Sequence, residues 1–414
     1  MPTVSITLAE ILTAREQRQA KQTALLGRFS HPLLCATMNM AGAQKDAPAL
    51  RLAFAHAWER LHQTLQAPLY QEIELLPTGA VGWAVYDLPA ETVKTAAQAI
   101  EDETPLGRLY DLDVLDATGA KCARPVQRPC IVCGKAGAAC ARSRAHGLDA
   151  VTDAMRQRLR AGCADLLAER ATDALLREVH VTPKAGLVDE ANNGAHRDMH
   201  VPLFEASAYA LQPYFAQCVR AGSDREALRT IGKRAEAAML QVTGGVNTHR
   251  GAIYCFGLTL GALGASLFSD DFPVALAALT QNELAAADSS HGGQAFLRYG
   301  AGGARAEAQS GFAHARMAAK RLNAETPSDV LLWLMSQVTD TNVLYRTGEE
   351  GASFLREQAR QILRLPASAR PAAHAALDAA CIARGISAGG CADLLALALF
   401  LHDLSVPLAL WQEL

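Results

Sequence analysis

The sequence predicts a multidomain protein in which an N-terminal α+β or α/β domain, residues 1–150, precedes an all-α domain, residues 151–414. Three observations support this prediction. A chain of 414 residues is long for a single hydrophobic core. Short apolar runs of strand length, such as Val81–Leu88 and Leu112–Leu115, lie in the first part. Beyond residue 150, segments of helical length dominate and no convincing strand is found.

The first element is a predicted helix near the N-terminus. Thr7 and Glu10 fit a Thr-x-x-Glu capping box, which marks a helix start. The turn-prone stretch 39–48 then interrupts the next apolar run. The mixed pattern that follows, with its two apolar runs, favours strands over long helices.

The second part is predicted to consist of helices. Ser223 and Glu226 fit a second capping box. The charged, helix-forming segment Thr152–Arg177 predicts a helical junction between the domains and not a flexible linker. The predicted helices span about 151–180, 202–220, 224–242, 252–268, 273–287, 327–345, 353–364 and 391–402.

Composition and charge exclude some classes of function. The net charge of −3 does not suggest a nucleic-acid or anionic-membrane surface. The uncharged stretch Gly251–Ser269 approaches the length of a membrane span, but its glycines and polar residues favour a buried core helix. Ten cysteines without a signal peptide ahead of them indicate a cytoplasmic protein.

A cysteine-rich motif carries the first candidate chemistry. Its spacing is Cys-x2-Cys-x6-Cys-x5-His, formed by Cys130, Cys133, Cys140 and His146. Such ligands can close a tetrahedral zinc site. The second half of the spacing is not that of a standard zinc knuckle, so the sequence favours free thiols beside phosphate-binding arginines. Arg142, Arg144 and His146 form a cationic patch suited to polyphosphate.

Two carboxylates upstream suggest a metal site. Asp111 and Asp113 are two residues apart, so on a strand they share a face and can hold one Mg²⁺ between them. A solvated strand edge is the alternative.

These motifs resemble the citrate lyase holo-acyl-carrier-protein synthase family (the apo-citrate lyase phosphoribosyl-dephospho-CoA transferase) over about residues 5–147. The resemblance rests on four stretches of sequence, residues 15–18, 39–42 with Lys45, 107–114 and 128–146. Ala41 stands where the family is expected to have proline. It implies that a serine of the acyl carrier protein attacks the α-phosphate of the triphosphoribosyl group and that pyrophosphate leaves. Asp111 and Asp113 would act in catalysis and hold Mg²⁺. The residues expected to bind phosphate or substrate are Arg15, Arg18, Asn39, Lys45, Arg108, Arg128, Arg142, Arg144 and His146.

Polar loops of the helical part predict a second site. Loops rich in Asp, Asn, His and Gly point to a shared polar cleft; they are 182–189, 192–198, 243–251, His291-Gly, 303–307, 340–342 and 389–393. Asn342 continues an apolar helical stripe, whereas Asp340 projects to the opposite side. Either the helix ends near Thr339, or Asp340 lies in another environment.

This pattern resembles the triphosphoribosyl-dephospho-CoA synthase family over about residues 165–405. Ala185, Arg250 and Tyr345 depart from expected proline, lysine and histidine. The resemblance implies that ATP and 3′-dephospho-CoA are joined with loss of adenine, through an oxocarbenium-like transition state at the ATP ribose. Mg²⁺ would bind the triphosphate, with Asp189 and Asp198 as candidate ligands.

The resemblance also implies roles for other residues of the helical part. Lys184, His249 and Arg250 would bind phosphate, and His196 or His291 would protonate adenine. Carboxylates for the metal or for the ribose carbon are Asp189, Asp198, Glu236, Glu307 and Asp340. Further expected substrate contacts are Asn193, Asn247, Asn342 and Asp393.

Taken together, the two resemblances predict a bifunctional transferase that makes the prosthetic group of citrate lyase and attaches it to the acyl carrier protein, the γ subunit. Prosthetic-group synthesis for malonate decarboxylase is one alternative. A zinc-stabilised nucleic-acid-binding module fused to a helical domain is another, and the slightly acidic balance argues against it.

Overall fold

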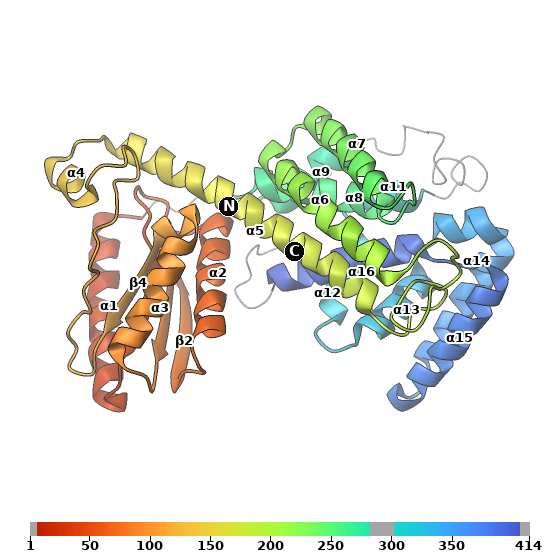
Figure 1. The fold of residues 1–414 in the computed structure, drawn as a ribbon, viewed down its shortest axis with the longest axis horizontal. Coiled ribbons are helices and arrows are strands. Elements are labelled where there is room, and N and C mark those ends of the chain that lie inside the picture. Colours follow the sequence, from red (N-terminus) through yellow and green to blue (C-terminus); the bar gives the residue numbers. More distant parts are fainter. Residues whose placement is uncertain (1–5, 282–301, 406–414) are drawn as a thin grey trace. The chain divides into compact units, whose positions relative to one another are not determined.

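The computed structural model describes residues 6–281 and 302–405 (Figure 1). The chain divides into two compact units. Unit 1 is Met1–Leu166 with Leu267–Asp270, and unit 2 is Leu167–Ser266 with Asp271–Leu414. The division between Leu166 and Leu167 falls inside a single helix, α5 (Leu148–His180), so the junction is helical, as predicted.

Unit 1 contains a four-stranded sheet with the strand order β2-β3-β1-β4, and every pairing in it is antiparallel. Antiparallel pairing favours α+β over α/β, the two classes that the sequence left open. Its elements are α1 (Leu8–Phe29), β1 (Leu33–Met38), α2 (Pro48–Thr64), β2 (Tyr70–Leu76), β3 (Gly79–Val85), α3 (Ala90–Glu103), η1 (Pro105–Leu109), β4 (Tyr110–Leu115) and α4 (Gly137–Ser143).

The two faces of this sheet are covered by different helices. On one face, Leu33, Cys35 and Trp83 pack against Leu25 of α1. The other face packs against α2, since a Cβ on Gly82 of β3 would lie only 2.4 Å from the ring of Trp58. Side chains alternate between the two faces along each strand, so the face of every strand residue follows from the register.

Unit 2 consists of helices, with no strand among its described residues. The uncharged stretch around 251–269 forms α8, which is largely buried, and α16 is buried around most of its circumference. Among the described residues, no helix has the length and apolarity needed to cross a bilayer. The remaining elements are α6 (Val201–Ala221), α7 (Arg225–Val242), α8 (Arg250–Ala265), α9 (Phe272–Thr280), α11 (Gly303–Gln309), α12 (Ala313–Arg321), α13 (Pro327–Gln337), α14 (Thr341–Leu363), η3 (Ala367–Ala369), α15 (Arg370–Arg384) and α16 (Gly389–Ser405).

Of the two predicted capping boxes, one is confirmed. The Thr7 hydroxyl accepts from the Glu10 amide at 3.3 Å, and Glu10 accepts from the Thr7 amide at 2.8 Å. The box at Ser223 is wrong by one residue, because Asp224 caps α7 by accepting from two backbone amides. A carboxylate competes well for this position, since it also interacts favourably with the helix dipole.

The single predicted helix 327–345 is wrong. Helix α13 ends at Gln337, and Asp340 caps the start of α14 by accepting from the Asn342 and Val343 amides at 2.8 and 3.3 Å. The chain therefore breaks next to Thr339, which is one of the two possibilities left open by the sequence. The predicted helix 353–364 is the later part of α14. Helices α11, α12 and α15 were not predicted.

Candidate active sites

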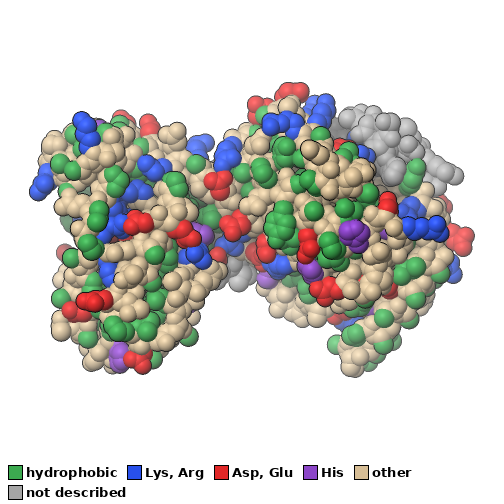
Figure 2. All heavy atoms as spheres, in the orientation of Figure 1, with side chains coloured by type: hydrophobic (Ala, Val, Ile, Leu, Met, Phe, Trp, Pro, Cys, Tyr) green, Lys and Arg blue, Asp and Glu red, His purple; other side chains and the backbone are tan. Residues whose placement is uncertain are grey.

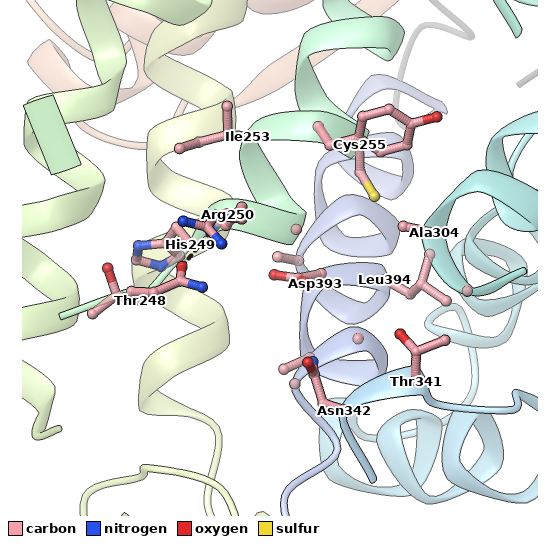
Figure 3. A pocket seen from close by; sticks show the side chains of 18 of the residues that line it. Thr248, His249, Arg250, Ile253, Cys255, Ala304, Thr341, Asn342, Asp393 and Leu394 are labelled. Atoms are coloured by element: carbon pink, nitrogen blue, oxygen red, sulfur yellow. Dashed lines mark hydrogen bonds between the residues drawn. The ribbon is translucent and has the colours of Figure 1, made fainter. Parts of the chain in front are cut away.

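A cavity of about 1000 Å³ lies within unit 2. Figure 3 shows Thr248, His249 and Arg250 at the start of α8, facing Asp393 on α16, with Thr341 and Asn342 at the start of α14. Gly389 and Gly390, at the start of α16, also line the cavity. Three helices thus begin at one cavity, and the positive ends of their dipoles favour an anionic ligand there.

Charged side chains line this cavity. The cationic ones are Lys184, Arg225, Arg229, Lys233, Arg250, Arg305 and Arg346, and the acidic ones are Glu178, Glu236, Glu307, Asp340 and Asp393. Arg225, Arg229 and Lys233 are spaced four residues apart on α7, so they lie along one side of that helix. These three residues were not predicted from the sequence, although their helical spacing next to the 243–251 motif was a usable signal.

Lys184 and Arg250, two predicted phosphate-binding residues, are both paired with acids. The Lys184 ammonium is buried and donates to the Glu178 carboxylate at 2.7 Å and to the Glu178 carbonyl at 2.9 Å. Arg250 forms an ion pair with Glu236, another predicted site residue. The amide of Arg250 donates to Asn247 at 3.1 Å, so Asn247 helps to set the start of α8.

His249 presents a neutral ring to the cavity. Its Nδ1 lies 2.7 Å from the Ser207 hydroxyl, which in turn accepts from the Thr248 hydroxyl at 2.8 Å. Because Ser207 accepts from Thr248, its own hydrogen is available to Nδ1, and in that arrangement the ring hydrogen of His249 sits on Nε2, which is buried and has no hydrogen-bond partner among the described residues. Burial, helped by the charge of Lys184, lowers the pKa of His249 to about 3. The ring can therefore donate a hydrogen bond to a ligand without carrying charge.

Two buried carboxylates stand at helix starts in the cavity. Asp340 accepts from the Cys391 amide at 2.9 Å in addition to capping α14. Asp393 accepts from the Ala252 amide of α8; burial, then the charges of Glu178 and Asp340, raises its pKa well above the usual value. Burial likewise raises the pKa of Asp340. Burial thus opposes the charged form of both carboxylates, and a bound cation would stabilise that form.

Glu307 and His196 also line the cavity. One Glu307 oxygen lies 2.5 Å from His314 Nδ1, and the other is buried without a hydrogen-bond partner among the described residues. His196 Nε2 lies 2.8 Å from the Ser387 hydroxyl. Burial, then the charge of Arg346, lowers the pKa of His196.

Other predicted residues lie elsewhere. Asp189 is buried and does not line the cavity. Its oxygens accept from the amides of Lys184, Ala191 and Asn192 and so fold the 182–192 loop. Asp198 and Asn193 are exposed and do not line it either. His291 lies outside the described residues.

Two residues that were not predicted hold the same loop. Asp378 of α15 accepts from the Gly186 amide and from the Asn192 side chain, each at 2.8 Å. His374 Nε2 accepts from the Ala185 amide at 3.2 Å, and its Nδ1 lies 2.9 Å from the Ser328 hydroxyl. Because almost 200 residues separate these partners, nothing local in the sequence indicated the contact.

The buried His374 should make the stability of unit 2 depend on pH. Burial lowers its pKa to about 4 from 6.5, so the unfolded chain takes up the proton first as pH falls. The stabilising contribution of the neutral ring is therefore complete above pH 6.5 and is lost as the pH falls toward 4. Over this range the equilibrium constant for unfolding should rise by up to about tenfold per pH unit. Hydrogen exchange of unit 2 amides, corrected for intrinsic rates, measures the free energy of unfolding against pH. His374→Gln should reduce the slope of this dependence between pH 4 and 6.5. An unchanged slope in the variant would contradict the assignment.

In unit 1, Asp111 and Asp113 share one face of β4, as predicted. They pair with Thr37 and Cys35 of β1, which places them on the face covered by α1. The Thr37 hydroxyl donates to Asp111 at 3.4 Å, and Lys121 donates to Asp113 at 2.6 Å. Burial, then the charge of Asp113, raises the pKa of Asp111.

Helix α1 brings predicted cations to the same face. Burial raises the pKa of Cys35 to about 12, and the charge of Arg18 partly offsets this effect. Burial, then the charge of Arg15, lowers the pKa of Lys45. The charges of Arg15 and Arg18 thus act on Lys45 and on Cys35, and Cys35 is the β-sheet partner of Asp113. Asn39 is exposed, and its backbone amide donates to the Leu109 carbonyl at 2.7 Å.

The other predicted arginines of unit 1 divide into two kinds. Arg128 donates to the Tyr110 carbonyl at 2.7 Å and pairs with Glu101, and Arg108 donates to the Pro129 carbonyl at 3.1 Å. Arg142 and Arg144 are exposed and have no ion-pair partner among the described residues. Figure 2 shows basic side chains on the surface around α4. These two arginines remain available for an anionic ligand.

Comparison with known families identifies two matches. Residues 6–161 match the family described as apo-citrate lyase phosphoribosyl-dephospho-CoA transferase. Residues 164–411 match ATP:dephospho-CoA triphosphoribosyl transferase. The two matches adjoin within α5.

Full-length similarity points the same way. The chain is 34% identical over 444 residues to "Protein CitXG" of Haemophilus influenzae, covering 95% of this chain and 96% of that protein. It is 35% identical to the 2-(5″-triphosphoribosyl)-3′-dephosphocoenzyme-A synthase of Haemophilus ducreyi, covering 66% of this chain and 99% of that protein. A probable synthase of the same name from Pseudomonas fluorescens is 41% identical, covering 58% of this chain and 91% of that protein.

The chain is therefore a transferase with two activities on one polypeptide. It belongs to both families, as a fusion of the apo-citrate lyase phosphoribosyl-dephospho-CoA transferase with the triphosphoribosyl-dephospho-CoA synthase.

Proposed function

We propose that the cavity of the helical part, residues 151–414, joins ATP to 3′-dephospho-CoA with release of adenine. The observation that carries this proposal is the meeting of three helix starts, seven cationic side chains and the buried acids Asp340 and Asp393 around one cavity of about 1000 Å³. This volume is at the upper end of ligand pockets, which suits two nucleotides. The excess of cations suits a triphosphate that stays on the product.

Each part of the cavity has a proposed role. Arg229, Lys233 and Arg250 bind the triphosphate, together with the neutral Nε2–H of His249. Asp393 stabilises the positive charge that develops at C1 of the ATP ribose as the bond to adenine breaks. His196, whose pKa is lowered by burial, is neutral near pH 7. It is therefore better placed to accept the proton of the 2′-hydroxyl of 3′-dephospho-CoA, whose oxygen forms the new bond to C1 of the ATP ribose, than to protonate adenine. Adenine leaves with the electron pair of the broken bond to C1 and takes up a proton from solvent.

Magnesium fits this cavity by the chemistry of its oxygen donors. We place Mg²⁺ at Asp340 and Asp393, because Mg²⁺ is commonly held by one or two carboxylates together with substrate phosphates. Of the carboxylates predicted earlier, Asp189 and Asp198 do not line the cavity. When bound, Mg²⁺ would neutralise part of the triphosphate charge.

We propose that residues 1–150 catalyse the second transfer, to a serine of the citrate lyase acyl carrier protein. The serine oxygen forms a bond to the α-phosphorus, the bond from that phosphorus to the bridging oxygen breaks, and pyrophosphate leaves. Asp111, whose pKa is raised by burial, accepts the serine proton. Arg15, Arg18, Lys45, Arg142 and Arg144 neutralise the phosphates, and Asp111 and Asp113 would hold Mg²⁺.

Intact-mass spectrometry of the apo acyl carrier protein tests both reactions. Incubation with this chain, ATP, 3′-dephospho-CoA and Mg²⁺ should add one phosphoribosyl-dephospho-CoA group to the carrier. Released adenine, measured in the same reaction, reports on the first step alone. Adenine release without carrier modification would contradict the second assignment, and no adenine release would contradict the first.

Gly251 should be required for the first step. A Cβ there would lie 1.9 Å from Asp393 Oδ2, so Gly251→Ala should displace that carboxylate. We expect adenine release to slow at least about tenfold, because small misplacements of reacting groups cost large factors in rate. Gly257→Ala in the same helix is the matched control, since a Cβ there meets only the Cys218 sulfur at 3.9 Å. Equal rates in the two variants would contradict the role of this close approach.

A further inference from the structure

The cysteine motif of unit 1 forms a compact turn followed by a short helix. The Cys130 amide donates to the Lys135 carbonyl at 2.6 Å, and the Gly134 amide donates to the Cys130 carbonyl at 2.9 Å. Gly134 has a φ of 73°, a left-handed conformation that glycine adopts easily and that lets the chain reverse. Helix α4 then carries Cys140 back toward the turn, and His146 follows its C-terminal end.

This path brings four potential ligand atoms together. The sulfurs of Cys130, Cys133 and Cys140 and a ring nitrogen of His146 all lie within 4.8 Å of one another. The Cys133 and Cys140 sulfurs are 3.6 Å apart, and His146 Nε2 is 3.3 Å from the Cys133 sulfur. Zinc bonds of about 2.3 Å to sulfur and 2.0 Å to nitrogen in a tetrahedron would set such separations at about 3.5–3.8 Å.

The burial of this region supplies an independent reason for a bound metal. From Asp116 to Ala150 no side chain is buried, and α4 buries none of its residues. Hydrophobic packing therefore cannot hold this segment in one conformation. Small segments without a core of their own commonly depend on a disulfide or a structural metal. All four cysteines from Cys122 to Cys140 are free thiols.

The backbone also favours a thiolate at the turn. The amides of Cys133 and Val132 are directed at the Cys130 sulfur. Hydrogen bonds from backbone amides stabilise a negative sulfur, which is the form that binds metal.

We propose that Cys130, Cys133, Cys140 and His146 bind one structural Zn²⁺. Four protein ligands leave no open position, so the ion stabilises the fold and does not act in catalysis. The unusual spacing of the motif favoured free thiols, whereas the convergence of the four ligand atoms favours the metal.

The site would also fix the arginines around it. Arg128 directly precedes the turn and donates to the Tyr110 carbonyl at the start of β4, next to Asp111. Arg142 and Arg144 lie between Cys140 and His146, so a metal held by those two ligands would limit their range of positions. The zinc would thereby orient basic side chains that we assign to phosphate binding, and this consequence rests on the proposed function.

Metal analysis of the full-length protein tests the site itself. The wild-type protein, purified without chelators, should contain about one zinc per chain, and Cys133→Ser should lose at least about nine-tenths of it. Cys122→Ser is the matched control, because Cys122 lies outside the cluster, and it should retain the zinc. Retention of zinc by Cys133→Ser, or loss from both variants, would overturn the ligand assignment.

A second measurement covers the case in which the variant does not fold. The wild-type protein is stripped with a chelator and titrated with Co²⁺ under reducing conditions. We expect one equivalent to give the intense visible absorption of tetrahedral, thiolate-bound cobalt. A wild-type protein that contains no zinc and gives no such spectrum, or that carries a Cys133–Cys140 disulfide by mass spectrometry, would refute the proposal. Neither measurement depends on either catalytic activity, so this outcome is separate from a failure of the proposed function.

Discussion

Asp393→Asn is expected to lower the rate of adenine release by about 100- to 1000-fold, the usual cost of removing one preorganised charge from an active site. The substitution keeps the size of the side chain, and an amide oxygen can still accept from the Ala252 amide. Because burial already makes the charged carboxylate unfavourable, the variant should fold at least as well as the wild type. Adenine release under saturating ATP and 3′-dephospho-CoA measures the effect.

Asp198→Asn is the control for this experiment. Asp198 belongs to a motif that resembles the synthase family, but it is exposed and does not line the cavity. We therefore expect its rate to stay within about twofold of the wild type, as for most surface substitutions. The same loss in both variants would mean that the cavity is not the site of the reaction. Transfer of the finished prosthetic group to the carrier should be unchanged in both variants.

The second large effect is expected from Asp111→Asn. Removing the proposed base and one magnesium ligand should slow modification of the carrier by at least about 100-fold, the lower range for loss of a general base. Adenine release should be unaffected, so this variant and Asp393→Asn should each lose a different step. Modification of the carrier by a supplied triphosphoribosyl compound isolates the second step.

Asp87→Asn is the matched control in unit 1, because Asp87 is exposed and lies outside the proposed site. It should modify the carrier at the wild-type rate. If Asp111→Asn behaved like this control, Asp111 would be a surface residue of the strand, which is the alternative that its sequence motif allowed.

Strand periodicity predicted the geometry of Asp111 and Asp113 well. A side chain repeats its face every two residues in any strand, so this inference needed only the correct assignment of β4. Helix α1, which carries Arg18, covers this face of the sheet. This coverage depends on tertiary packing and was not predictable from local spacing.

The break between α13 and α14 shows where periodicity fails. The apolar spacing of Leu331 and Leu334 continues to Val338 and would extend to Asn342, so the pattern alone favours one helix. A carboxylate that caps a new helix start outweighs this pattern. The same break places Asp340 and Asn342 at the cavity.

Buried polar pairs were the least predictable part of the site. Glu178 lies within a long charged helix and carries no local signal, yet it is buried against Lys184. Burial of a charged group is decided by distant partners, so a single sequence does not reveal it.

The helix shared by the two units limits how the protein can be divided into fragments. Met155, Leu159 and Cys163 of α5 are buried, and all three belong to unit 1, whereas Leu167 and Leu175 are buried in unit 2. A fragment ending at residue 150 would lose the first three side chains and expose the apolar surface that they cover. A gene truncated after codon 166 should therefore give a more soluble transferase half than one truncated after codon 150.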